Sequence, residues 1–180
     1  RDLLSRIIYG SRVSLGIAFL TLLLGAGLGT AIGLVSGFAG GKIDATLMRI
    51  TDTTLAFPTI LLALLLAVVL GASVTNVVLA IGLTMWARYA RMVRGEVLSI
   101  KERDFVAQAR IIGCSPMRII LQHIFPNVVN TIMVLISLQV GWVIIVEASL
   151  SFLGAGVPPP TPAWGSMIAS GRNYVTSAWW

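Results

Sequence analysis

Long stretches without a charged residue place the strongest constraint on how this chain can fold. Val13 to Phe38 is 26 residues without a charge, and Thr53 to Ala87 is 35. About 20 such residues cross the hydrocarbon core of a bilayer as one helix. Because a straight helix of 35 residues would be about 52 Å long, the second run must contain two spans and a turn. The sequence therefore predicts an all-α membrane protein and excludes a soluble globular fold.

Four spans account for the uncharged runs, at about residues 13–38, 44–70, 74–95 and 128–150. Gly71 to Ser73 is the expected outer turn between the second and third spans. Pro58 should kink the second span, because proline removes a helix hydrogen bond. The expected fold is a polytopic bundle of transmembrane helices that forms a single domain over residues 1–180.

Two segments outside these spans are expected to lie at the membrane surface. Arg1 to Arg12 has apolar residues at helical spacing between its charges, which is typical of a short surface helix. Ser151 to Pro162 contains four prolines and two glycines and cannot form a helix. The sequence from Trp164 to Ala178 then predicts an interfacial helix within an outer loop that covers residues 151–180.

Glycine recurs at every fourth position in the second half of the first expected span, at Gly25, Gly29, Gly33 and Gly37. A spacing of four places these residues on one face of the helix. Such small-residue faces allow two helix backbones to approach closely in lipid. Since each glycine costs a helix roughly 1 kcal/mol in water, four in register favour a role in helix packing.

The distribution of basic residues predicts the orientation in the membrane. The net charge is +6, and Lys42, Arg49 and seven residues between Arg88 and His123 make up nine of the 13 Lys and Arg. Basic residues between spans collect on the cytoplasmic side. These segments are therefore expected to face the cytoplasm, and residues 71–73 and 151–180 the outside. The same bias explains the positive charge, so nucleic acid is not an expected partner.

Residues 96–126 form a charged, amphipathic island between the third and fourth expected spans. Its first helix is expected from Glu102 to Ile112, and Gly113 is a natural stop at its C-terminus. The apolar residues expected on one side of this helix are Phe105, Val106, Ala109 and Ile112. A charged loop of this length on the cytoplasmic side is typical of a membrane protein that holds a cytoplasmic partner.

A second helix is expected in the island at about residues 116–125. Ser115 has N-cap chemistry, Pro116 suits the first helical position, and Pro126 should end the helix. Its apolar residues are Met117, Ile120, Leu121 and Ile124. Two short helices joined by a glycine corner would form a compact knob. The chemistry alone leaves open an ordinary amphipathic loop on lipid headgroups.

The island resembles the EAA loop of ABC-importer permeases. That pattern is Glu-Ala-Ala, three residues, Gly, nine residues, then Ile-x-Leu-Pro. Ala107, Gln108 and Ala109 stand at its first three positions, Gly113 at its glycine and Pro126 at its proline. Departures are Ala107 for Glu, Gln108 for Ala, His123 for Ile and Phe125 for Leu. The segments similar to the dipeptide and oligopeptide (DppC/OppC-like) branch include RDLLSRIIYGSRVSL, AFPTILLAL, RIILQHIFPN and EASLSFLGAGVPPPTPAWGSMI.

The resemblance covers essentially the whole chain and implies the type I ABC-importer permease fold. It implies a multi-pass protein of the bacterial or archaeal cytoplasmic (inner) membrane, with further helices before Arg1 and after Trp180. In that family the glycine-cornered helix is the coupling helix, which sits in a cleft of a cytoplasmic ATPase. Residues 96–126 are therefore called the coupling loop. The coupling residues that the resemblance implies are Ala107, Gln108, Ala109, Arg110, Gly113, Cys114 and Ser115.

The resemblance also implies the partners and the cofactors. The partners are a second permease subunit in a heterodimer, two cytoplasmic ABC ATPase subunits, an extracytoplasmic solute-binding protein and membrane lipid. The sequence contains no G-x-x-x-x-G-K-[ST] phosphate-binding motif, so this chain should bind no cofactor, and ATP and Mg should belong to the ATPase subunits.

The expected function is that of a permease subunit that imports dipeptides or oligopeptides. An import system for nickel or another small solute is the alternative, because a separate binding protein usually carries the selectivity in such systems. An intramembrane enzyme is disfavoured, because neither H-E-x-x-H nor G-x-S-x-G occurs and the only histidine, His123, lies in the coupling loop. No catalytic or metal-binding residue is expected.

Two acidic residues of the expected spans have two interpretations each. Glu147 would either face the translocation path or hydrogen-bond to the turn at residues 151–156. Asp52 would either face the path or pair with Arg49, which lies three residues earlier on the same helix face. The sequence leaves both pairs of alternatives open.

Overall fold

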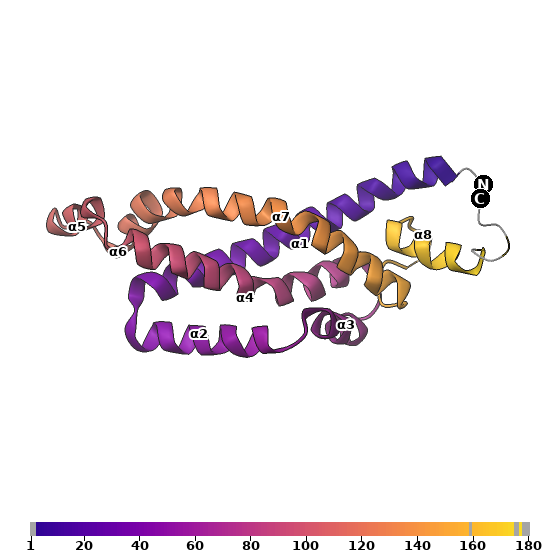
Figure 1. The fold of residues 1–180 in the computed structure, drawn as a ribbon, viewed down its shortest axis with the longest axis horizontal. Coiled ribbons are helices and arrows are strands. Elements are labelled where there is room, and N and C mark those ends of the chain that lie inside the picture. The colour runs from indigo at the N-terminus through magenta and orange to yellow at the C-terminus, as the bar shows by residue number, and fades with distance from the viewer. Residues whose placement is uncertain (1–2, 159, 175–176, 178–180) are drawn as a thin grey trace. The chain divides into compact units, whose positions relative to one another are not determined.

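The computed structural model describes residues 3–158, 160–174 and 177, and these form helices, turns and loops without a strand (Figure 1). The expected all-α fold class is confirmed. The α-helices are α1 (Leu3–Ala39), α2 (Gly41–Ala56), α3 (Thr59–Leu70), α4 (Val74–Ile100), α5 (Asp104–Ile111), α6 (Pro116–Arg118), α7 (Phe125–Phe152) and α8 (Trp164–Gly171). A π-helix, η1 (Ile119–Ile124), precedes α7, and a 3-10 turn, η2 (Arg172–Tyr174), follows α8.

Among the described residues, two helical stretches are long and apolar enough to cross a membrane. These are α1 and the continuous run Pro116–Phe152, and α2 with α3 makes a third if the two count as one broken span. α4, where the third span was expected, carries Arg88, Arg91 and Arg94 in its second half. The count of four spans therefore stays a prediction.

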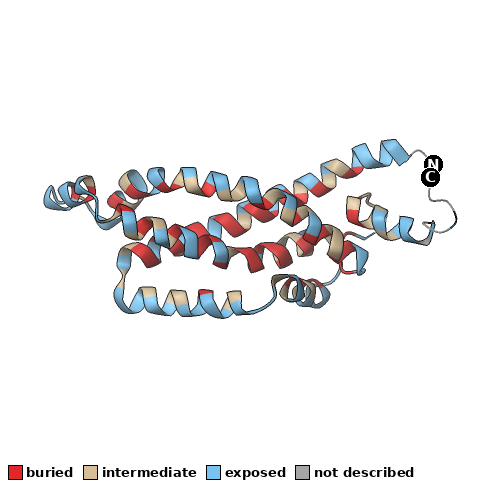
Figure 2. Ribbon diagram, in the orientation of Figure 1, coloured by how far each residue is buried: buried red, intermediate tan, exposed pale blue. Residues whose placement is uncertain are grey.

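The contacts divide the chain into two units, which are described separately. Unit 1 contains Arg1–Leu24, Pro58–Thr84 and Gln139–Trp180, and unit 2 contains Gly25–Phe57 and Met85–Leu138. The long helices α1, α4 and α7 each contribute one part to each unit. Buried residues recur along α4, whereas α2 contains one buried residue, Thr51, and α3 contains two, Ala63 and Ala67 (Figure 2).

In unit 2, the glycine face of α1 lies directly against α4. A Cβ atom added at Gly33 would lie 2.7 Å from the carbonyl oxygen of Ala90 and 2.8 Å from Cβ of Val93. One at Gly37 would lie 2.7 Å from Cβ of Val97, and Gly29 faces the backbone of α4 one turn earlier. Side chains at these positions would hold the two backbones apart, so the glycines set the separation of the helices.

In unit 1, Trp164 fastens the start of α8 to α1. Its indole Nε1 donates a hydrogen bond to the carbonyl of Ile7, and its backbone N–H donates one to the Ser14 hydroxyl, both 3.1 Å long. Gly10 makes room for the indole, because a Cβ there would lie 3.3 Å from the ring. Gly165 likewise lies against the backbone of Ala148 in α7.

The structure corrects the expected surface helix at residues 1–12. Residues from Leu3 onward belong to one continuous helix, α1, which ends at Ala39. No proline interrupts this stretch, and the cost of Gly10 in a helix, about 1 kcal/mol, is too small to end it. The contact between Gly10 and Trp164 explains the presence of a glycine at this position.

Pro58 separates two helices and does not merely kink one. α2 ends at Ala56, Phe57 is extended (φ −85°, ψ 139°), and α3 begins at Thr59. The proline ring disfavours the helical conformation for the residue before it, so the helical hydrogen-bond ladder stops at Phe57. The expected second span at 44–70 is therefore two separate helices.

Pro126, which was expected to end the second helix of the coupling loop, lies inside a continuous helical run. The N–H of Phe125 bonds to the carbonyl of Ile120, five residues earlier, in the wide turn of η1. Pro126 then falls in the first turn of α7, where a helix tolerates a missing N–H. The prediction was wrong because it assumed α-helical pairing on both sides of the proline.

The outer loop begins with a left-handed glycine. Gly154 has φ 84°, and the N–H of Ala155 bonds to the carbonyl of Leu150 over 2.9 Å, which closes α7 two residues beyond the expected span. The interfacial helix expected from Trp164 to Ala178 is α8 followed by η2, which ends at Tyr174. Residues 175–176 and 178 of that expected helix lie outside the described residues.

Candidate functional site

The coupling loop turns at Gly113 in a geometry that a glycine favours. Its φ is 84°, in the left-handed region. The N–H of Gly113 bonds to the carbonyl of Arg110 and that of Cys114 to the carbonyl of Ala109, both over 3.0 Å. These two bonds satisfy carbonyls that the end of α5 would otherwise leave free.

The second helical segment starts directly after this turn. Ser115 caps it, because its hydroxyl accepts a hydrogen bond from the N–H of Arg118, and Pro116 occupies the first helical position. Val106 of α5 is buried, as are Ile119 and Ile124 of η1. The loop is therefore an ordered pair of helical segments that contact each other and carry buried apolar side chains.

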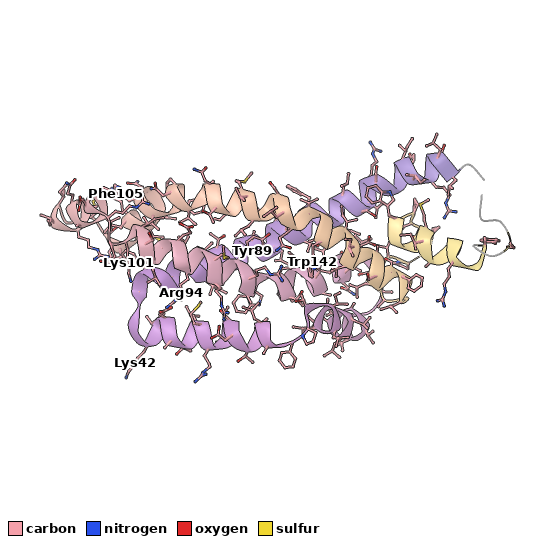
Figure 3. All side chains as sticks on the ribbon, viewed as in Figure 1. Lys42, Tyr89, Arg94, Lys101, Phe105 and Trp142 are labelled. Carbon is pink, nitrogen blue, oxygen red and sulfur yellow. The ribbon has the colours of Figure 1, made fainter. Side chains whose placement is uncertain are left out.

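His123 is part of the same packing. Its ring lies 6.5 Å from that of Phe105 on α5, measured between centroids, and the amide of Asn127 donates to its backbone carbonyl. Figure 3 shows Phe105 on the coupling loop.

Five large apolar side chains of this loop are exposed: Ile111, Ile112, Met117, Leu121 and Phe125. We call the first four the apolar tip. Ile111 is 86% and Ile112 80% exposed. The sequence analysis grouped Ile112 with the buried Val106 and Ala109, and this grouping was wrong. Ile112 still has helical geometry, because its N–H bonds to the carbonyl of Gln108 over 3.0 Å, but the described residues leave its side chain almost uncovered.

The expected coupling residues lie together on α5 and the turn that follows it. Among them Ala109 is buried and Cys114 half-buried, whereas the exposed ones are Ala107, Gln108, Arg110, Gly113 and Ser115. The guanidinium carbon of Arg110 lies 5.7 Å from the centre of the Phe38 ring, at the end of α1.

A polar cluster that the sequence analysis missed joins α1, α2 and α4 in unit 2. Asp44 accepts two hydrogen bonds from Arg94, of 2.6 Å from Nε and 2.5 Å from Nη2, and a further one from the Ser36 hydroxyl. Lys101 donates to the carbonyl of Gly37 over 3.1 Å. Figure 3 shows Arg94 on α4 and Lys101 directly after the end of that helix, with Lys42 at the start of α2. Charged residues within otherwise apolar helices were the available signal for this cluster.

Asp52 pairs with Arg91 of α4, and not with Arg49 as expected. Both side chains are about half exposed. Residues three apart on one helix are neighbours, but Arg91 reaches Asp52 from the adjacent helix of unit 2. The prediction of a local pair did not take Arg91 into account.

Glu147 lies in unit 1, near the end of α7, and is only 1% exposed. Its Oε1 accepts a hydrogen bond of 2.8 Å from the Ser151 hydroxyl, whose oxygen accepts one of 3.1 Å from the N–H of Val157. The Ser14 side chain also lies beside this carboxylate. The carboxylate is thus linked to the start of the outer loop.

Comparison with known proteins assigns the chain to a class. Residues 29–178 match the family described as binding-protein-dependent transport system inner membrane component. Because this match covers more than half of the chain, the chain belongs to that family, and the resemblance noted in the sequence is confirmed.

Three relatives illustrate the range of named transport systems. A Brucella suis biovar 1 protein, provisionally named as a peptide transport system permease protein, is 42% identical over all of this chain and 60% of its own length. The nickel transport system permease protein NikC of Escherichia coli (strain K12) is 42% identical over 97% of this chain and 63% of its own. The glutathione transport system permease protein GsiD of Pectobacterium atrosepticum is 40% identical over 99% and 59%. The chain spans about three-fifths of each relative's length.

Proposed function

We propose that this chain is the membrane-spanning core of an ABC-importer permease subunit. Its coupling loop would bind a cytoplasmic ATPase subunit and transmit the movement of that ATPase to the spans. The observation that carries this proposal is the ordered coupling loop with its exposed apolar tip. Side chains as exposed as Ile111 and Ile112 gain free energy when a partner covers them.

The remaining partners follow from the same proposal. They are a second permease subunit, two ATPase subunits that carry ATP and Mg, and an extracytoplasmic solute-binding protein. The permease would catalyse no reaction itself, and it would reside in the cytoplasmic membrane of a bacterium or archaeon as a multi-pass protein. The family match and the names of the relatives support this assignment.

For the substrate we propose a dipeptide or oligopeptide. One relative is named for peptide transport and another for glutathione, which is itself a peptide. Nickel is the second candidate, because a relative of equal identity is named for nickel transport. Stimulation of ATP hydrolysis by dipeptides, glutathione or Ni²⁺, each added with the cognate binding protein, separates these substrates.

We further propose that Glu147 holds the outer loop in place and does not contact the substrate. The hydrogen bond from Ser151 and the near-complete burial support this role. Asp52, at an exposed pair, remains the candidate for a polar group on the translocation path.

The apolar tip provides the test of the main proposal. Replacing Ile111 and Ile112 together by Ser should lower retention of the ATPase about tenfold during purification of the assembled transporter. That factor corresponds to about 1.4 kcal/mol, and the full burial of two such side chains would contribute more. Ile50→Ser, at an exposed isoleucine on α2, is the matched control and should retain the ATPase fully. Equal retention by both variants would contradict the proposal.

The proposed orientation predicts labelling from one side only. A cysteine introduced at Ser99 or Met117 should react with an impermeant maleimide only from the cytoplasmic side, and one at Thr161 or Ser170 only from outside. Cys114 is replaced by Ser in all these proteins, because it is a free thiol. Labelling at Met117 in intact cells would reverse the orientation.

A further inference from the structure

The last turn of α1 receives contacts from two parts of the coupling loop, its first residues at the end of α4 and the helix α5. Lys101 donates a hydrogen bond of 3.1 Å to the carbonyl of Gly37, and Val97 packs against the same glycine. One residue later, the Phe38 ring lies under the guanidinium of Arg110, 5.7 Å from its centre. Arg110 belongs to α5, so the coupling loop itself contacts the end of α1.

The start of α2 is hydrogen-bonded to the same end of α1 and to α4. The carboxylate of Asp44 accepts two hydrogen bonds from the guanidinium of Arg94, in the geometry that makes such pairs strong and directional. The Ser36 hydroxyl, from α1, donates to the same carboxylate. The side chains of Asp44 and Arg94 are 15% and 31% exposed, so water screens this pair less than it screens Asp52 and Arg91.

The connection between α1 and α2 is short, and its two glycines, Gly40 and Gly41, have no side chains that could hold it in position. Gly40 and Gly41 have φ values of 65° and 54°, and a Cβ at either would meet no atom within 4 Å. A pair of glycines in open space lets the chain bend. The position of this turn is therefore set by the contacts of Ser36 to Phe38 and of Asp44.

We infer that residues 36–44, the α1–α2 corner, move with the coupling loop as one body, and that Asp44, Arg94 and Lys101 are the positioning residues that link them. This inference rests on the proposed function, because it requires an ATPase that moves the coupling loop. All these contacts lie within unit 2. The α1–α2 corner would thus transmit the movement of the ATPase directly to the end of α1 and the start of α2.

Two pairs of spin labels test this inference in the assembled transporter, with Cys114 replaced by Ser. One pair joins Lys42→Cys on the corner to Gln122→Cys on the coupling loop, outside the apolar tip, and the other joins Gln122→Cys to Ser170→Cys on α8 in unit 1; all three residues are exposed. Distances are measured without nucleotide and after trapping with ATP, Mg and vanadate. In the otherwise unaltered protein the first distance should stay constant, while the second should change.

Two variants should make the distance between the first pair of labels depend on nucleotide. Asp44→Asn removes the charge that holds Arg94, and Lys101→Met removes the donor to Gly37 while it keeps the ion pair. In both, the distance between the labels at 42 and 122 should shift and broaden on trapping, and Asp44→Glu should restore the constant distance. Lys101→Met keeps the test valid if Asp44→Asn does not assemble. Asp52→Asn is the matched control on α2 and should leave the distance constant.

The outcomes separate this inference from the function on which it rests. A distance between 42 and 122 that changes in the protein without further substitution, or that stays constant in both variants, would overturn the inference alone. A distance between 122 and 170 that does not respond to trapping would overturn the proposed function, and the inference with it. A purely stabilising role would lower the yield of the variants without making the first distance depend on nucleotide.

Discussion

Replacing Gly33 by Leu is expected to prevent α1 from packing against α4 and so to destroy the folded bundle. Even a Cβ at this position would lie 2.7 Å from the Ala90 carbonyl oxygen and 2.8 Å from Cβ of Val93, both on a helix that cannot yield locally. Overpacking of this kind costs about 3 kcal/mol or more. The fraction of monodisperse protein after mild heating in detergent should fall severalfold, as measured by size-exclusion chromatography.

Gly27 supplies the matched control for this experiment. It lies on the same helix two turns earlier, it is exposed, and a Cβ there would meet no atom within 4 Å. Gly27→Leu should therefore be as stable as the unaltered protein. Equal stability of Gly27→Leu and Gly33→Leu would mean that the glycine face does not determine helix packing.

The sequence predicted those features that depend on local chemistry. Glycine spacing indicated which face of α1 could approach another helix, and Gly113, Ser115 and Pro116 indicated where one helix of the coupling loop stops and the next begins. A left-handed glycine, an N-cap and a proline at the first position each act within four residues. Such signals can be read without knowing the tertiary structure.

The features that the sequence did not predict depend on partners far along the chain. Asp44 could not be matched with Arg94, 50 residues away, because helical spacing says nothing about which helix lies opposite. For the same reason Asp52 was assigned to Arg49, its neighbour on α2, although Arg91 of α4 binds it.

Pro126 illustrates a different limit. Its ring would end an ordinary α-helix, but the π turn of η1 moves the backbone pairing by one residue and lets the helical run continue into α7. No residue preference in IILQHI distinguishes a π turn from an α turn. The continuity of the run matters for the proposed function, because a stiff connection couples the loop to α7.

Replacing Gly113 by Asp is expected to abolish uptake and to weaken ATPase retention strongly, while the permease itself folds and inserts normally. Gly113 is exposed, has φ 84°, and a Cβ there would meet no atom of this chain within 4 Å. A residue other than glycine costs roughly 1–2 kcal/mol in this conformation, and Asp tolerates it better than most. Under the proposed function, the effect would therefore arise where the turn contacts the ATPase, from the bulk and charge that the variant adds beside Ile111 and Ile112.

Two further variants separate these causes. Gly113→Asn has the shape of Asp without its charge and the same tolerance of positive φ. A milder defect in Gly113→Asn than in Gly113→Asp would therefore show that the difference comes from the charge of Asp, which the bound ATPase would bury. Arg110→Ala removes one exposed charge and its contact with Phe38, and should lower uptake less than either. Uptake and ATPase co-purification are measured together for all three. If Gly113→Asp retained both, the coupling loop would lie on lipid headgroups, and the assignment as a transporter subunit would then rest on the family match alone.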